Sequence, residues 1–166
     1  MSTEVSTRER IASLTNWTVP IVAIATILAS LLGVPWQFIP AQPASHMPEL
    51  NLTFSDLQTA SETSISPIQR AYFGGLIWVL IVLSITLALT AVKSRTRTVE
   101  IAEAAVAAVA LVFTVLACKG PSTWSEFIQS IPNLRLGGYL FIIGLMLLLV
   151  HGLAELRKRN VAETLH

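Results

Sequence analysis

Charged side chains are scarce in this chain: Asp, Glu, Lys and Arg make up 13% of its 166 residues, whereas 53% are hydrophobic. A soluble domain carries about 25% charged residues, because its surface faces water. The low charge and the mean hydropathy of +0.66 therefore exclude an ordinary soluble globule and a disordered chain. A net charge of +1 also excludes a broad nucleic-acid-binding surface, so nucleic acid is not an expected partner.

The sequence motifs of common enzyme and cofactor sites are missing as well. Cys118 is the only cysteine, which excludes a CxxC redox motif and a disulfide within the chain. His151 is the only histidine in an apolar run, so one chain cannot supply both axial histidines of a haem. HExxH, GxSxG and a phosphate-binding glycine loop are absent too. We therefore expect a protein that is not an enzyme, with no catalytic residue, no cofactor and no metal.

Long apolar runs dominate what remains, and they predict the fold. There are four of them, at residues 17–39, 72–92, 101–118 and 138–156. About 20 helical residues cross the hydrocarbon core of a bilayer, where backbone groups must be satisfied within the segment. The sequence thus predicts one all-α membrane domain over residues 1–166, a four-transmembrane-helix bundle with loops at 40–66, 93–98 and 119–137.

The basic residues predict the orientation of this bundle. Eight lie before the first run, in the 93–98 loop or after the fourth run, and three lie on the opposite side. The eight are Arg8, Arg10, Lys93, Arg95, Arg97, Arg157, Lys158 and Arg159, and the three are Arg70, Lys119 and Arg135. Lys and Arg accumulate in cytoplasmic loops, so both termini are expected in the cytoplasm of a multi-pass plasma-membrane protein.

The second outer loop, residues 119–137, predicts a short amphipathic helix. Thr123 and Glu126 have the spacing of a capping box, and Pro132 ends the helical pattern. Trp124 and Phe127 begin an apolar stripe at helical spacing, which suits a helix lying in the membrane interface. The stripe is interpreted as an anchor that shields the bundle, with a lid or docking surface as the alternative.

Small residues mark the helix faces expected to pack, because apolar side chains gain little by leaving lipid. The expected packing positions are Ala25, Ala29, Gly33, Ala107, Ala110 and Gly144. The run at 101–118 has two faces, of which the small one is expected to point inward. Its large face, together with the helix of the second outer loop, is expected to meet lipid or a partner: Val106, Val109, Phe113, Leu116, Trp124 and Phe127.

Ionisable residues near the membrane interior are the remaining candidates for chemistry. Glu103, His151 and Glu155 are the closest to it, and the last two share a helical face at i, i+4 spacing. A carboxylate beside an imidazole could relay protons or bind a cation. Their shallow predicted depth favours the alternative, a structural contact between helices, and the spacing gives only weak support for a metal site.

Two functions follow from this pattern. The first is a non-enzymatic accessory or assembly subunit that packs against a larger membrane protein complex. The second is a small homo-oligomeric transporter or channel that uses Glu103 and His151. The expected partners are the lipid bilayer and other integral membrane subunits or copies of the chain itself.

Overall fold

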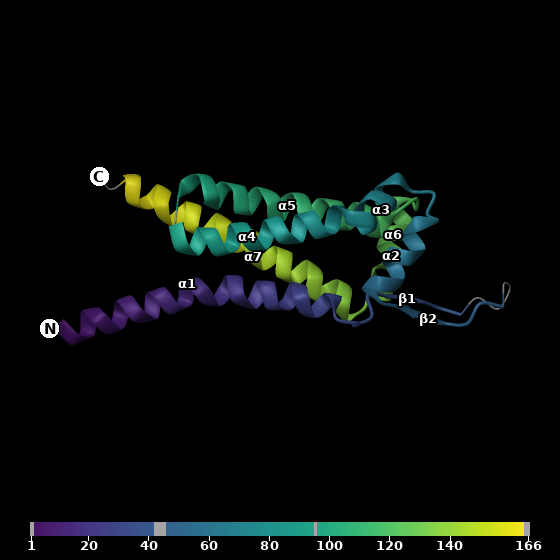
Figure 1. Cartoon of the computed structure of the whole chain (residues 1–166), viewed down its shortest axis with the longest axis horizontal. Helices are drawn as coiled ribbons and strands as arrows, with labels where there is room; N and C mark the ends of the chain where they lie inside the picture. Colours follow the sequence, from purple (N-terminus) through teal and green to yellow (C-terminus); the bar gives the residue numbers. More distant parts are fainter. Residues whose placement is uncertain (1, 42–45, 95, 165–166) are drawn as a thin grey trace.

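The computed structural model describes residues 2–41, 46–94 and 96–164, with the side chains of residues 17–41, 46–94 and 96–160. The structure is 79% helical. Four long helices run along the longest axis of the molecule (Figure 1): α1 (Ser2–Leu31), α4 (Ile77–Ser94), α5 (Arg97–Lys119) and α7 (Leu136–Thr164). Both termini lie at one end, and the short helices and strands lie at the other.

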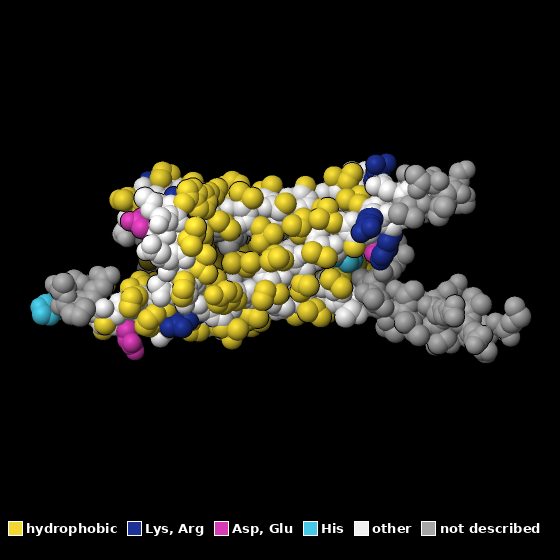
Figure 2. Space-filling view, turned by 180° about the vertical axis from the view of Figure 1, so that it is seen from behind, with side chains coloured by type: hydrophobic (Ala, Val, Ile, Leu, Met, Phe, Trp, Pro, Cys, Tyr) yellow, Lys and Arg dark blue, Asp and Glu magenta, His cyan; other side chains and the backbone are white. Residues whose placement is uncertain are grey.

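Three helical segments are long and apolar enough to cross a membrane: Pro67–Ser94, Arg97–Lys119 and Leu136–Asn160. Hydrophobic side chains cover the middle of the face shown in Figure 2, and several Lys and Arg side chains gather at the end where the chain termini lie. An apolar band with charge at its end is what a bilayer requires of a protein surface. These features indicate a membrane protein.

The first apolar run differs from the prediction, because helix α1 ends at Leu31 and not near residue 39. Gly33 has a φ of +74°, in the left-handed region, and the indole N–H of Trp36 donates to the Ser30 carbonyl at 2.7 Å. Hydrophobicity alone does not distinguish a helix from a strand in such a run. The apolar part of α1, Trp17–Leu31, is consequently shorter than the other three helices.

Part of the segment between α1 and α4 packs against the bundle. Strand β1 (Gln37–Ile39) pairs antiparallel with β2 (Leu50–Leu52), and helix α2 (Phe54–Glu62) follows with a Thr53–Asp56 capping box. The Trp36 ring lies 5.3 Å from that of Phe54 and 5.0 Å from that of Phe141 on α7. Such ring pairs stabilise beyond the area they bury. These aromatic contacts with the bundle therefore hold the segment in place.

The chain enters α4 through a wide helical turn. Helix α3 (Pro67–Ala71) begins at the cap Ser66, and the π-helix η2 (Tyr72–Leu76) joins it to α4. The side-chain amide of Gln69 donates to the Ala117 carbonyl at 2.9 Å, and the Tyr72 and Thr114 hydroxyls are 2.6 Å apart. These contacts hold the beginning of this helical segment against α5.

The helix expected in the second outer loop is present as α6 (Trp124–Ser130). Its capping box joins Thr123 and Glu126, with the Glu126 carboxylate accepting the Thr123 N–H at 2.7 Å. Pro132 lies in the 3-10 turn η3 (Ile131–Asn133) that ends the segment. Trp124 is exposed and Phe127 half-buried, so the apolar stripe of α6 is largely available to the surroundings.

Helix α7 is central, because it packs along both α1 and α5, while α4 packs on α5. At Gly144 a Cβ atom would lie 2.5 Å from Cγ1 of Ile27 and 2.9 Å from the carbonyl oxygen of Ala23. Both of these residues belong to α1. The missing side chain of Gly144 therefore allows α1 and α7 to approach closely.

The packing face of α1 is not the one expected. Ala25 and Gly33 are exposed and Ala29 is half-buried, whereas Ala23 and Ile27 are fully buried. A pattern of small residues marks candidate packing faces. The close approach of the two helices at Gly144 determines which of these faces of α1 contacts α7.

Helix α5 presents its small residues to the interior. The structure buries Glu103, Ala107, Ala110, Thr114 and Ala117. On the other face Val109 is exposed, and Val106, Phe113 and Leu116 are half-buried. Phe113 also packs against the core, so only part of the large face is free for lipid or a partner.

Candidate functional site

A buried acid–base pair joins α5 to α7 toward the end that carries the chain termini. Nδ1 of His151 lies 3.1 Å from Oε1 of Glu103, and the two side chains are 7% and 1% exposed. The sequence singled out both residues, and the structure places them in contact. The pair is therefore an interhelical contact between a carboxyl group and an imidazole.

Gly152 explains how His151 comes within reach of Glu103. A Cβ atom at Gly152 would lie 3.1 Å from the Ala104 nitrogen and 3.2 Å from the Glu100 carbonyl oxygen. The absence of a side chain here brings the antiparallel helices α5 and α7 together beside the pair. Sequence reasoning missed Gly152, although a glycine beside a histidine in an apolar run is a usable signal.

A second ion pair lies on the same two helices and was also missed. Nη2 of Arg159 lies 3.0 Å from Oε1 of Glu100, whose side chain is 4% exposed. Glu100 precedes Glu103 by three residues, so the two acids share one face of α5. That spacing was the available signal, because the basic tail of α7 returns to the end where α5 begins.

Glu155 does not join these pairs. Its carboxylate accepts a hydrogen bond from Lys158 at the surface of the same helix. Exposed pairs at this spacing add little to stability, because solvent screens both charges. The i, i+4 relation to His151 therefore does not produce a three-residue site.

Each of the two buried acids has one oxygen without a partner among the described residues, Oε2 of Glu100 and Oε2 of Glu103. A buried polar atom without a hydrogen bond is costly, so these two oxygens are the least satisfied polar atoms of the site. Within the described ranges no cluster of three or more His, Cys, Asp and Glu side chains could hold a metal ion.

Comparison with known proteins adds no family to this description. No protein-family model matches the chain, and no curated protein or solved structure matches it either.

Proposed function

We propose that the chain is a four-span plasma-membrane protein with cytoplasmic termini that acts, without catalysis, as an accessory or assembly subunit of a larger membrane protein complex. The observation that supports this proposal most is that the chain's buried charged groups pair with one another. Glu103–His151 and Glu100–Arg159 both connect α5 to α7, so the ionisable groups hold the chain's own helices together.

The four-span topology treats α1 as a short span. Its apolar part, Trp17–Leu31, rises about 22 Å at about 1.5 Å per residue, against about 30 Å for the hydrocarbon core. Leu32, whose side chain is 80% exposed, continues the apolar surface beyond the end of the helix. Local thinning of the bilayer accommodates a remaining mismatch at modest cost.

The distribution of surface favours a role in assembly. Trp36 and α6 pack against the bundle at the end opposite the termini, and the β1–β2 hairpin extends beyond them (Figure 1). Apolar side chains such as Val82 on α4 and Val109 on α5 face outward along the spans. A protein whose main surface lies within the bilayer recognises other proteins there, through helix packing.

A small homo-oligomeric transporter or channel is the second candidate, and one observation favours it. Glu100 and Glu103 keep unpaired oxygens in the buried site, and intramembrane acids of this kind mark proton and ion pathways. In that function Glu103 and His151 change protonation during each transport cycle.

The two candidates separate in one set of variants. We expect Glu103→Gln and His151→Gln to keep a stoichiometric partner, measured by mass spectrometry of complexes cross-linked in native membranes and normalised to inserted chain. Val109→Trp should reduce recovery of that partner at least tenfold, because a large ring on the free part of the α5 face blocks helix packing. Val150→Trp is the matched control, on an exposed position of α7.

Two results contradict the accessory function. One is the absence of any stoichiometric partner. The other is an intact assembly in which Glu103→Gln abolishes proton-driven flux in proteoliposomes, which would establish the transporter instead.

A further inference from the structure

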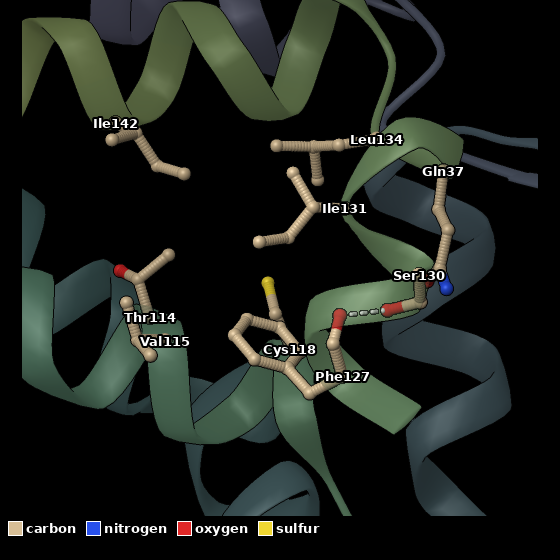
Figure 3. Close-up of a pocket in the computed structure, with 9 residues that line it drawn as sticks. All are labelled: Gln37, Thr114, Val115, Cys118, Phe127, Ser130, Ile131, Leu134 and Ile142. Carbon is tan, nitrogen blue, oxygen red and sulfur yellow. Dashed lines mark hydrogen bonds between the residues drawn. The ribbon is translucent and has the colours of Figure 1, made fainter. Parts of the chain in front are cut away.

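A cavity of about 50 Å³ lies between α5 and α7, at the end of the bundle opposite the termini. Val115 and Cys118 line it from α5, Phe127 from α6 and Ile142 from α7, and Figure 3 shows the Cys118 sulfur pointing toward Ile131 across this space. Ile131 is exposed as well as lining, so the cavity reaches the molecular surface beside α6.

Six of the nine residues that line the cavity are apolar, counting Cys118, so its walls favour an apolar ligand; the polar ones are Gln37, Thr114 and Ser130. The Thr114 hydroxyl already bonds to the Ala110 carbonyl and to Tyr72, and the Ser130 hydroxyl donates to the Phe127 carbonyl. A water needs two to four polar partners, and an apolar cavity of about 150 Å³ binds a molecule as large as benzene while it stays dry. A space one-third of that size suits a few carbon atoms of a longer chain that enters from the surface.

Two basic side chains follow lining residues in the sequence and lie near the same end of the bundle. Lys119 follows Cys118, and its ammonium lies 5.3 Å from the centre of the Trp124 ring. Arg135 follows Leu134, is exposed, and has its guanidinium carbon 4.3 Å from the centre of the Phe38 ring. The Lys119 ammonium donates one of its three N–H groups to the Ser122 carbonyl and keeps two, and a guanidinium has five donors, so both cations can bind a further acceptor.

Glu126 is the acid near Lys119, and its carboxylate is engaged by the backbone N–H and the hydroxyl of Thr123. Among the described residues no acidic side chain forms an ion pair with Arg135, so it offers the clearer site for an anion. An apolar cavity with basic side chains at the same end of the bundle is complementary to a phospholipid, in which the acyl chains and a phosphate are attached to one glycerol.

We propose that this cavity binds an acyl-chain segment of a phospholipid whose phosphate contacts Arg135 and Lys119. The lipid would fill the space under α6 and fix that helix at the interface. The proposal rests on the membrane insertion proposed above, but not on the accessory function.

The experiment uses the full chain in nanodiscs that contain a phospholipid with a photoactivatable diazirine in the upper half of one acyl chain. Peptide mapping should place cross-links mainly on residues 114–118 and 127–142. Val115→Phe fills the cavity and should lower this labelling at least fivefold. Val112→Phe is the matched control on the lipid-facing side of the same helix, where the native side chain is 57% exposed, and it should leave the labelling unchanged.

A second pair of variants guards against misfolding of the first: Ile142→Phe should also block labelling, while Ile143→Phe at an exposed position should not. Arg135→Gln should weaken labelling by the phospholipid but not by a diacylglycerol with the same diazirine. Even labelling along all helices, or undiminished labelling in both cavity-filled variants, would overturn the proposal. Equal labelling by the two lipids would overturn the role of the phosphate. Failure of the chain to enter nanodiscs would instead contradict membrane insertion.

Discussion

The contact of α1 with α7 at Gly144 is the tightest test of the fold. A Cβ atom added there would lie 2.5 Å from Cγ1 of Ile27, whereas carbon atoms in contact prefer about 3.5–4.0 Å. The nearest backbone atom, the Ala23 carbonyl oxygen, would be 2.9 Å away. Ile27 is fully buried and Ala23 is helical backbone, so neither can yield without moving the helix. Gly144→Ala must therefore push α1 and α7 apart by about 1 Å.

Two opposing effects determine how much Gly144→Ala changes the free energy of unfolding. Overpacking a well-packed contact costs about 1–3 kcal/mol. Alanine is about 1 kcal/mol better than glycine inside a helix, which offsets part of that cost. We expect Gly144→Ala to lose between about 0 and 2 kcal/mol of unfolding free energy relative to the native chain.

A control glycine isolates the packing cost. At Gly74 a Cβ atom would meet nothing within 4 Å, so Gly74→Ala gains the helical preference without the clash. The free energy of unfolding, measured by denaturant titration in detergent micelles with circular dichroism, should be about 1–3 kcal/mol lower for Gly144→Ala than for Gly74→Ala. If the two variants unfold within about 0.5 kcal/mol of each other, α1 does not pack on α7 through the Ala23 and Ile27 face.

Three further predictions follow from the same structure. Ala107→Leu should lower the free energy of unfolding by about 1–3 kcal/mol, because Ala107 is fully buried, while Val109→Leu on the exposed side of α5 should change it little; equal effects would contradict the orientation of α5. In a variant without the native cysteine, Ser125→Cys on α6 should react with an impermeant thiol reagent in intact cells, and reaction only after permeabilisation would reverse the proposed topology. Hydrogen bonds from Thr123 hold the pKa of Glu126 below its usual value of 4.5, so the cap contributes stability above the ordinary glutamate pKa and loses it as the pH falls through the lowered value. A carboxyl titration by nuclear magnetic resonance should therefore show a midpoint below 4.5 for Glu126, and Thr123→Val should raise that midpoint. An unchanged midpoint would show that the Thr123 hydroxyl does not stabilise the Glu126 carboxylate.

Sequence reasoning was sufficient where composition and local chemistry decide the outcome. A charged fraction of 13% indicates a membrane protein before any helix is placed. The α6 helix was predictable because the Thr123–Glu126 capping box involves atoms only three residues apart. The small inward face of α5 was predictable too, since helical periodicity alone places Ala107 and Ala110 on one side.

Other features depended on contacts between distant segments, and the sequence left them open. An apolar run does not show where α1 ends, and the end at Leu31 requires Trp36 to fold back and bond to the Ser30 carbonyl. Ala23 and Ala25 are equally small, and only the close approach of α1 and α7 at Gly144 places Ala23 in the contact.

The buried polar site was likewise predictable from the sequence only in part. The sequence identified Glu103 and His151 as ionisable residues near the membrane, because charge in an apolar run is visible at any position. Their contact at 3.1 Å, and that of Glu100 with Arg159, came only from the close approach of α5 and α7 beside Gly152. The type of each residue determines which interactions it can make. Which side chains actually meet depends on how closely the helix backbones approach one another.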